Sequence, residues 1–467
     1  MKQVTPPQGS TDRRPEGRPP ARILIVGGGY VGMYAALRLQ RRLHRGEAEI
    51  TVVDPQPYMT YQPFLPEAAA GSIDPRHVVV PLRQVLRGCT VVTGEITSLD
   101  HRARRAWAAT AATRSTGAPD LDLPYDLLVV APGSVSRTLP IPGLADHGIG
   151  FKTVEEAVAL RNHVLEQLDI ASSTRDPAIR QAALTFVFVG GGYAGVEALA
   201  ELEDMARYAT RYYHNLTADD LRWVLVEAAD RILPEVGPEL GRYTVSELRG
   251  RNVEVRLNTR LESAADRIVA LSDGSRFAAR TLVWTAGVRP APVLADSDLP
   301  RDSRGRVRCA PTLEVAGTEG VWSAGDCAAV PDLARPGEYC TPNAQHAVRQ
   351  GKVLGDNVLA RLRGEPQTPY QHRHAGAVAS LGLHKGVAQV RGRRLTGRPA
   401  WLLHRAYHLN RLPTLNRKAR VLADWVLAGL STREIVSLGS LEHPRAEFEA
   451  AMDGGPTPPP REVDPRG

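Results

Sequence analysis

Cysteine is scarce in this chain. Its 467 residues include four, Cys89, Cys309, Cys327 and Cys340. They are widely spaced and form no Cys-x-x-Cys pair, so the sequence supports neither a disulfide framework nor a zinc site, and we expect no bound metal. Free cysteines are typical of a reducing compartment, which favours a cytoplasmic location.

Long apolar runs are also absent from the sequence. No uncharged apolar stretch reaches the ~18 residues of a membrane-spanning helix, so we expect no such helix. Residues 1–20 are rich in proline, arginine and glycine and lack the apolar core of a secretory signal. We expect residues 1–20, and most of the segment 441–467, to be disordered tails.

Lysine is the third scarce residue. Only five of the 58 basic residues are lysine, so arginine supplies nearly all the positive charge. The net charge of +7 is modest for this length, and there is no basic run or DNA-reading helix, so we expect no nucleic-acid partner. The charge does favour an anionic surface such as a cytoplasmic membrane leaflet.

Glycine turns, by contrast, are prominent and follow predicted strands. Residues 22–26 predict a short buried strand, and a Gly-x-Gly-x-x-Gly turn then leads into a helical pattern. Gly27 allows the tight turn, Gly29 lets the backbone approach a pyrophosphate, and Gly32 lets the helix pack on the strand. The next strand ends in Asp54, about 20 residues beyond the last glycine, where dinucleotide-binding units carry the acid that binds a ribose hydroxyl.

The same unit occurs a second time. A predicted strand leads into Gly190, Gly192 and Gly195, and the strand after the following helix ends at Glu227. Two such units imply two dinucleotides, normally a flavin and a nicotinamide. The Glu227 carboxylate would bind a ribose 2′-hydroxyl and repel a 2′-phosphate, so we expect NADH to be preferred to NADPH, although the nearby Arg231 would soften this preference.

Three more predicted strands end in turns of small residues, where open α/β sheets hold ligands. Gly133 follows the first of these strands, Gly287 the second, and Gly325 with Asp326 the third. An acid at position 326 is placed to hold a ribityl hydroxyl, with the helix that follows pointing its amino end at a flavin ring.

Two features of the sequence, the loop at residues 56–71 and Glu197, each allow two interpretations. The loop at residues 56–71 is rich in aromatic residues and proline, and it either walls an aromatic ring system or is a packed connection. Glu197 lies two residues after the second glycine turn, in what we expect to be the first turn of a helix. It is either an ordinary acid at a helix start or a carboxylate that faces the nicotinamide ring.

In combination these motifs resemble the two-dinucleotide-binding flavoprotein reductases. The segment 63–71 and the Ala-Gln…Gln-Gly pattern at 344–351 narrow the resemblance to the type II NADH dehydrogenases, which are single-chain, non-proton-pumping NADH:quinone oxidoreductases. The resemblance covers residues 22–429. Two departures stand out: Pro132 lies where the family usually has threonine, and Arg349 lies where its quinone motif has glutamine.

The resemblance implies non-covalent FAD and NADH as cofactors, with hydride passing from NADH to FAD and two electrons passing on to a membrane quinone, either menaquinone or ubiquinone. The predicted cofactor-binding residues are Gly27, Gly29, Gly32, Asp54, Gly133, Gly325, Asp326, Gly190, Gly192, Gly195, Glu227 and Gly287. The predicted catalytic residues are Glu197 and Gln345, and the predicted quinone contacts are Ala344, Gln345 and Gln350. Quinone reduction needs protons, and our hypothesis is that Glu197, or water near Gln345, delivers them.

The predicted fold is α/β, with two Rossmann-like domains, the second inserted in the first, and a C-terminal α+β segment that associates with a membrane. The expected segments are a tail at 1–20, the FAD domain at 21–150 and 301–365, the NADH domain at 151–300, a β element with amphipathic helices at 366–440, and a tail at 441–467.

Two helical stretches near the C-terminus, residues 400–412 and 415–430, carry the membrane prediction. An apolar stripe runs along the second, made by Leu415, Ala419, Leu422, Val426 and Leu430. Aromatic and basic residues mark the first, namely Trp401, His404, Arg405, Tyr407, His408 and Arg411. Such helices either lie in the lipid interface or pack on the core or on a second subunit, and a homodimer is compatible with both. We expect a peripheral protein on the cytoplasmic face of the cell membrane.

Other functions remain possible at this level. A sulfide:quinone oxidoreductase would need paired redox cysteines, and only Cys340 lies near the quinone motif. A soluble NAD(P)H-dependent reductase of an electron-carrier protein would not need the C-terminal helices. A non-catalytic NADH-sensing or nucleic-acid-binding flavoprotein would need a reading helix or a basic run.

Overall fold

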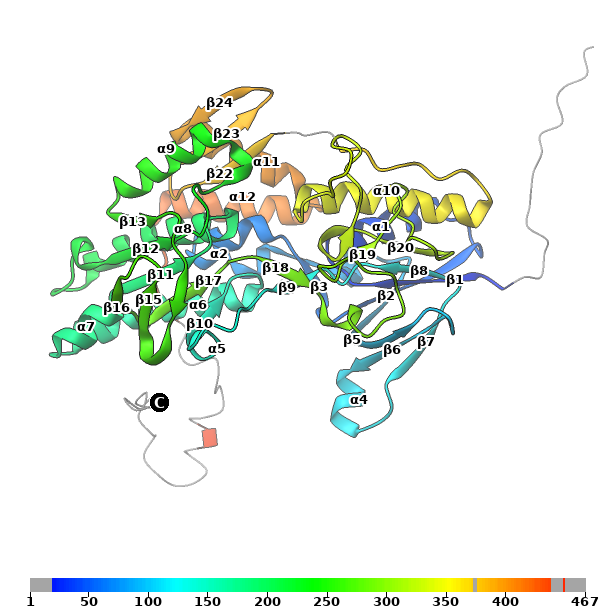
Figure 1. Ribbon diagram of the computed structural model, residues 1–467, viewed down its shortest axis with the longest axis horizontal. Helices are drawn as coiled ribbons and strands as arrows, with labels where there is room; N and C mark the ends of the chain where they lie inside the picture. The colour runs from blue at the N-terminus through cyan, green and yellow to red at the C-terminus, as the bar shows by residue number, and fades with distance from the viewer. Residues whose placement is uncertain (1–18, 373–375, 438–447, 450–467) are drawn as a thin grey trace, which may run out of the picture. The chain divides into compact units, whose positions relative to one another are not determined.

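The computed structural model describes residues 19–372, 376–437 and 448–449, so the predicted tails lie almost entirely outside the described residues. The chain forms two compact units. Unit 1 comprises residues 1–57, 81–133 and 290–372, and unit 2 comprises residues 58–80, 134–289 and 373–467 (Figure 1). Each unit contains a Rossmann-like parallel sheet, which confirms the predicted α/β fold. The finer division into six segments stays a prediction.

Unit 1 is built on a seven-stranded sheet in the order β20-β8-β1-β2-β5-β6-β7. Its strands are β1 (Ala21–Val26), β2 (Ala48–Asp54), β5 (Thr90–Asp100), β6 (Arg105–Thr110), β7 (Leu121–Pro124), β8 (Leu127–Val130) and β20 (Val321–Ser323). The strands from β20 to β5 are parallel, and β6 and β7 form antiparallel pairs. Residues 23–26 of the central strand β1 are all apolar and buried, as is typical of a parallel strand covered on both faces.

Helix α1 (Tyr30–Arg42) follows the first glycine turn and packs on α10 (Ala344–Arg363). A Cβ on Gly351 would lie 2.7 Å from the carbonyl oxygen of Val31, so the close approach of the two helices requires glycine there. The short elements of unit 1 are α3 (Leu82–Val85), α4 (Ala111–Thr116), η7 (Pro292–Leu294), β19 (Val307–Arg308), η8 (Gly325–Cys327) and β21 (Ala328–Ala329).

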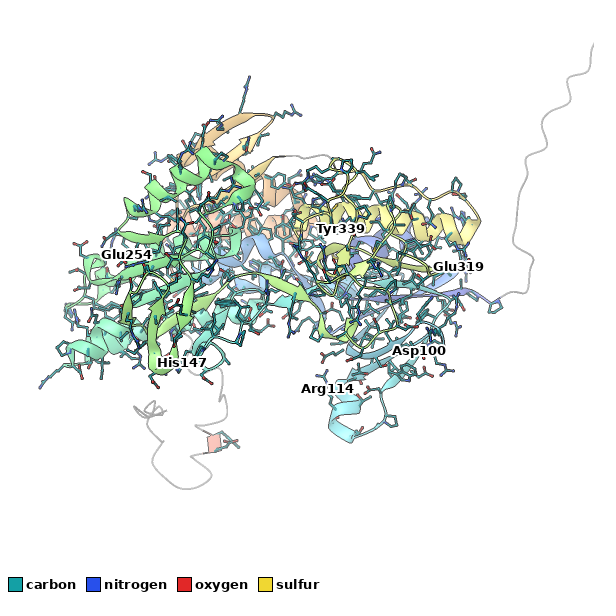
Figure 2. The ribbon with its side chains drawn as sticks, in the orientation of Figure 1. Asp100, Arg114, His147, Glu254, Glu319 and Tyr339 are labelled. Carbon is teal, nitrogen blue, oxygen red and sulfur yellow. The ribbon has the colours of Figure 1, made fainter. Side chains whose placement is uncertain are left out.

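Unit 2 contains a five-stranded parallel sheet in the order β10-β17-β11-β12-β13. Its strands are β10 (Gly148–Gly150), β11 (Thr185–Val189), β12 (Arg222–Val226), β13 (Val253–Arg256) and β17 (Thr281–Trp284). Its longer helices are α6 (Val154–Ser173), α7 (Pro177–Ala183), α8 (Tyr193–Ala209) and α9 (Pro238–Arg249). At the edge of the sheet, Glu254 (labelled in Figure 2) accepts hydrogen bonds of 2.7 Å from Arg222 and Arg256.

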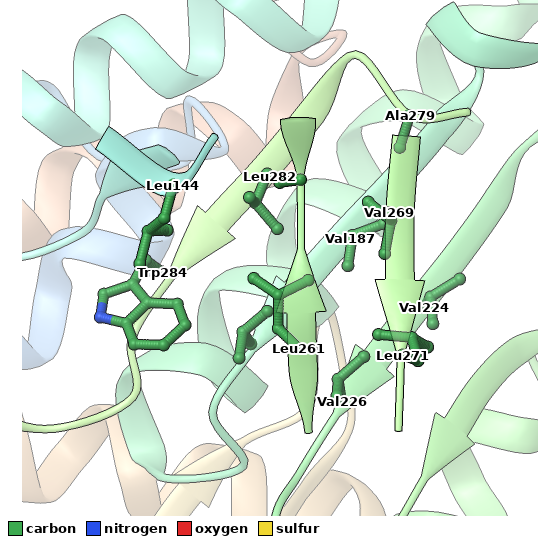
Figure 3. Packing of buried hydrophobic residues seen from close by; sticks show 12 residues of the cluster. Leu144, Val187, Val224, Val226, Leu261, Val269, Leu271, Ala279, Leu282 and Trp284 are labelled. Atoms are coloured by element: carbon green, nitrogen blue, oxygen red, sulfur yellow. The ribbon is translucent and has the colours of Figure 1, made fainter. Parts of the chain in front are cut away.

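A small antiparallel sheet covers one face of the parallel sheet of unit 2. It consists of β14 (Leu261–Ser263), β15 (Ile268–Leu271) and β16 (Arg276–Ala278), which pair antiparallel. Figure 3 shows the apolar layer between the two sheets, with Val187, Val224 and Leu282 on one side and Val269 and Leu271 on the other. This layer fixes the strand ends that carry the second glycine turn.

The C-terminal part of unit 2 is an antiparallel sheet followed by two helices. The elements are β22 (Ala377–Ser380), β23 (Gly386–Val390), β24 (Arg393–Thr396), α11 (Gly397–Arg411) and α12 (Leu415–Leu430). Helix α11 packs on β22 and β23, and β22 in turn contacts α8. The two predicted C-terminal helices are therefore confirmed, and among the described residues no helix is long and apolar enough to cross a bilayer.

The remaining elements of unit 2 are short. They are β3 (Tyr58–Thr60), η1 (Gln62–Phe64), α2 (Leu65–Ala69), η2 (Pro75–His77), β4 (Val79–Pro81), β9 (Ser134–Ser136), α5 (Leu144–His147), η3 (Thr210–Tyr212), η4 (Ala218–Asp220), η5 (Pro234–Val236), η6 (Ala265–Arg267) and β18 (Val288–Pro290). Helix α2 packs on α6 and α8, so the aromatic loop before it is a packed segment of this unit.

Candidate active site

The first glycine turn has the geometry that its spacing predicts. Gly27 has φ +96°, and a Cβ there would lie 2.1 Å from the carbonyl oxygen of Ala131. A Cβ on Gly32 would lie 1.8 Å from the carbonyl oxygen of Gly27, so the helix packs on the turn only if residue 32 is glycine. Gly29 differs: a Cβ there would meet no described atom within 4 Å. The turn therefore leaves open the side from which a pyrophosphate would approach.

Asp54 closes this turn. Its Oδ2 accepts a hydrogen bond of 2.6 Å from the backbone N–H of Gly28, and its Oδ1 accepts one of 2.8 Å from Gln56. Burial raises the pKa of Asp54. No side chain among the described residues caps the start of α1, so the helix end is available to an anion. This cradle fits a dinucleotide.

The second turn repeats the first almost group for group. Gly190 has φ +117°, and a Cβ on Gly195 would lie 2.0 Å from the carbonyl oxygen of Gly190. Gly192 is open, because a Cβ there would meet no described atom within 4 Å. Glu227 accepts hydrogen bonds of 2.5 Å from Gly191 and 2.7 Å from Ala229. This cradle also fits a dinucleotide.

The middle glycines, Gly28 and Gly191, were not predicted to have a role. Each donates its N–H to the acid that closes its turn, and a Cβ on Gly191 would lie 2.5 Å from Ile232. The sequence carried a signal for them, since both copies read Gly-Gly-Gly.

Two other predicted glycines lie in turns with positive φ. Gly133 has φ +73° and Gly287 has φ +97°, and a Cβ on either would meet no described atom within 4 Å. Gly133 follows β8 in unit 1, and Gly287 follows β17 in unit 2. Each therefore leaves backbone accessible at the end of a parallel strand, as a ligand-binding turn requires.

Gly325 and Asp326 follow β20 in unit 1, and the structure ties them to the quinone motif. The N–H of Gly325 donates a hydrogen bond of 2.8 Å to Oε1 of Gln350 on α10. Gln350 is 1 % exposed, so its side-chain oxygen fixes the turn that presents Asp326. Contact between Gln350 and a quinone stays a prediction.

Gln345 lies in the first turn of α10, next to Ala344, which begins the helix. Arg349, which lies where the family motif has glutamine, contacts Gln345. Its Nη1 donates hydrogen bonds to Oε1 and to the carbonyl oxygen of Gln345, at 3.2 and 3.3 Å. Buried His346 contacts the hydroxyl of Tyr370 at 2.9 Å, a pair that sequence reasoning missed.

Glu197 lies in unit 2 and is buried, with 6 % of its surface exposed. The prediction that it occupies the first turn of its helix was wrong. Helix α8 begins at Tyr193, because Gly192 is its N-cap residue, so Glu197 is the fifth helical residue. Its Oε1 accepts a hydrogen bond of 2.8 Å from the N–H of Ser380 and lies 3.2 Å from Nε2 of His404. Burial raises its pKa to about 8.

Glu67 on α2 and Glu201 on α8 are two of the other buried acids in the same unit. Glu67 accepts hydrogen bonds of 2.8 Å from Arg405 and 2.7 Å from the indole N–H of Trp425. Glu201 accepts one of 2.8 Å from the hydroxyl of Ser380. Burial raises the pKa of both acids. Neither was predicted, because a single acid in a loop or helix gives no signal of its burial.

The chain is similar to known proteins in both sequence and fold. Residues 21–351 match the family described as pyridine nucleotide-disulphide oxidoreductase. The type II NADH:quinone oxidoreductase of Staphylococcus aureus is 30% identical over 384 residues, which cover 81% of this chain and 92% of that protein. The type II NADH:quinone oxidoreductase Ndh of Mycobacterium tuberculosis is 29% identical over 442 residues, covering 91% and 92%. The chain belongs to the type II NADH:quinone oxidoreductase family.

The fold of this type II oxidoreductase agrees with that membership. The structure of NDH2 from Plasmodium falciparum in complex with NADH superposes with a TM-score of 0.81 at 17% identity, covering 89% of this chain and 99% of that one. The cysteines do not favour the sulfide:quinone alternative, since Cys309, Cys327 and Cys340 are buried and unbridged. Burial raises the pKa of Cys327 and of Cys340 to about 11, so both are thiols at neutral pH.

Proposed function

We propose that this oxidoreductase oxidises NADH and reduces a membrane quinone, with FAD held non-covalently. The observation that carries the proposal is the pair of glycine cradles, each closed by an acid, in a chain of this family. When bound, FAD accepts hydride from NADH and supplies two electrons to the quinone. The overall reaction, NADH + quinone + H⁺ → NAD⁺ + quinol, consumes one proton from solvent.

The cradle of unit 1 would hold the FAD. Its open position at Gly29 and the uncapped start of α1 suit the pyrophosphate, and Asp54 suits a ribose hydroxyl. Gly133 and Asp326 lie in turns after parallel strands of the same sheet, where the rest of the cofactor would lie.

The cradle of unit 2 would hold NADH. Gly192 leaves space for the pyrophosphate, and Gly287 lies in the turn after β17. Glu227 already accepts two backbone hydrogen bonds through its two oxygens and is therefore fixed in position. A 2′-phosphate beside this carboxylate would be repelled, which supports a preference for NADH over NADPH.

For the quinone we propose the start of α10, with Ala344 and Gln345 as contacts and Gln350 as the residue that positions the neighbouring turn. Arg349 places a positive charge within hydrogen-bonding distance of Gln345, where family members carry an amide in the resembling motif. A cation there favours the oxygen of a quinone as it gains electrons. As the source of the proton we propose Glu197.

Helix α12 carries the proposed membrane contact. Large apolar side chains on it are exposed, with Leu415 83% and Leu430 82% accessible, and Leu422, Val426 and Leu427 at least half exposed. An amphipathic helix with such a face would lie in a lipid interface, or against a second copy in a homodimer. The chain would then be peripheral, on the cytoplasmic face of the cell membrane, where NADH is available.

Helix α11 does not share this role in full. The aromatic and basic side chains of α11 lie only partly at the surface, because Trp401 is 9% and His404 1% exposed. Arg405 is paired with buried Glu67 at 2.8 Å. These side chains therefore pack within unit 2, and the exposed apolar face belongs to α12.

The test is a set of acceptor assays on purified protein saturated with FAD. We expect NADH-dependent reduction of a menaquinone or ubiquinone analogue, with no reduction of ferredoxin and no oxidation of sulfide. Gly29→Ala is the matched control, since its added methyl group changes the FAD cradle but meets no described atom within 4 Å. A protein that retains no flavin, or that reduces ferredoxin and not quinone, would contradict the proposal.

A further inference from the structure

Three of the buried carboxyl groups in unit 2, those of Glu67, Glu197 and Glu201, face a limited supply of positive charge. Glu67 is paired with Arg405 at 2.8 Å, and Glu201 has Arg433 at 3.9 Å. Glu197 has no arginine or lysine partner in the part of the chain that the structure describes. A buried carboxylate without a cation is costly, so Glu197 is the acid of this group that keeps its proton.

His404 is the side chain best placed to exchange that proton. It is 1% exposed, and its Nε2 lies 3.2 Å from Oε1 of Glu197. Neither of its ring nitrogens has a hydrogen-bond partner among the described residues, so the angle at this contact is not yet that of a hydrogen bond. A small rotation of the ring would make it one. A buried, unsatisfied imidazole beside a protonated acid is unusual in a native interior.

A second imidazole extends from this pair toward solvent. His408 follows His404 by one helical turn on α11, and the two ring centroids are 4.5 Å apart. His408 is partly exposed, and its Nδ1 lies 3.0 Å from the hydroxyl of buried Tyr61. The four side chains of Glu197, His404, His408 and Tyr61 therefore lie in sequence inside unit 2, each beside the next, with a hydrogen bond between His408 and Tyr61 and close contacts between the others. We call this series the imidazole relay.

We propose that the imidazole relay returns a proton from solvent to Glu197 each time Glu197 has released its own proton during turnover. This inference rests on the proposed function. His408 takes up the proton at one ring nitrogen and releases one from the other, and His404 repeats the exchange with Glu197. The step moves one proton and no electrons, and it supplies the single H⁺ that NADH-driven quinone reduction consumes.

The surroundings of the relay suit transient protonation. Glu67 and Tyr193 also interact electrostatically with Glu197, and the positive charge of Arg405 disfavours a standing charge on His404. Burial lowers the pKa of His404 to about 3 and that of His408 well below its ordinary value. Both rings are therefore neutral at rest, with one donor and one acceptor nitrogen each, as a relay requires.

The first test does not depend on turnover. The carbonyl stretch of the protonated Glu197 carboxyl is identified by infrared difference against Glu197→Gln, and its rate of shift after transfer to D₂O is measured in the FAD-loaded protein. We expect His404→Gln and His408→Gln to slow this exchange by about tenfold or more. Exposed His214→Gln is the matched control and should leave the rate unchanged. Exchange at the wild-type rate in both relay variants would overturn the relay.

The second test separates the two halves of turnover. In the relay variants we expect the rate at which NADH bleaches the flavin to stay within about twofold, while quinone reduction slows about tenfold or more and added imidazole restores it. Equal loss in both halves, without rescue, would overturn the relay in favour of a packing role. If His404→Gln does not retain FAD, the result for His408→Gln, a change at a partly exposed residue, decides between the relay and a packing role. A wild-type protein that reduces no quinone would overturn the proposed function itself, whatever the exchange rates.

Discussion

Replacement of Glu197 by glutamine should change how the stability of unit 2 depends on pH. Burial raises the pKa of this carboxyl from 4.5 to about 8, which corresponds to about 5 kcal/mol at ~1.4 kcal/mol per pKa unit. The folded state holds a proton that the unfolded chain releases above pH 4.5. The contribution of Glu197 to stability is therefore fully present below pH 4.5 and is lost as the pH rises to about 8.

Glu197→Gln keeps an oxygen that accepts from Ser380 but has no proton to lose. We expect its free energy of urea unfolding, relative to wild type, to rise by several kcal/mol between pH 5 and pH 8.5, with equal m-values. Both proteins contain Glu67 and Glu201, so the comparison removes the pH dependence of those acids apart from the coupling of Glu67 to Glu197. Exposed Glu262→Gln is the control and should follow wild type at every pH. A difference between Glu197→Gln and wild type that does not change with pH would refute the proposed protonation.

Three further outcomes follow from the geometry. Gly29→Ala should lose FAD but keep the melting temperature of the apoprotein. Gly32→Ala should lower that melting temperature, because its Cβ would lie 1.8 Å from a carbonyl oxygen. Calorimetry measures the melting temperature, and the flavin content of the purified protein measures FAD binding. Glu227→Gln should raise kcat/KM for NADPH relative to NADH by about tenfold, because one charge no longer repels the 2′-phosphate; equal ratios would contradict that role. Leu422→Glu with Val426→Glu should abolish co-sedimentation with anionic vesicles while activity with a soluble quinone analogue persists; chromatography reports whether a dimer is lost instead.

The glycine turns could be predicted because their signals are local. Each is a strand, a tight turn and a helix within a few residues, and the steric reasons that require Gly27 and Gly32 act between groups close in sequence or on the adjacent strand. The acids Asp54 and Glu227 were found by spacing alone for the same reason. Their hydrogen bonds to Gly28 and Gly191 are a consequence of parallel pairing, which puts the end of one strand beside the start of the next turn.

The partners of Glu197 could not be predicted from the sequence. Ser380 and His404 lie about 200 residues further along the chain, and they reach Glu197 only because β22 and α11 fold against α8. The aromatic and basic composition of α11 indicated a lipid-facing helix. Composition does not say which side of a helix faces the core, and the structure buries Trp401 and His404 on that side.

Helix α12 shows the opposite arrangement, with apolar side chains at the surface. Its apolar stripe would ordinarily face a core, yet Leu422 and Val426 are about half exposed, and it is Val421, fully buried, and Trp425 that face inward. The indole of Trp425 donates to Glu67, an acid that interacts electrostatically with Glu197. One helix therefore presents an apolar side outward and a hydrogen-bond donor to the buried acids inward.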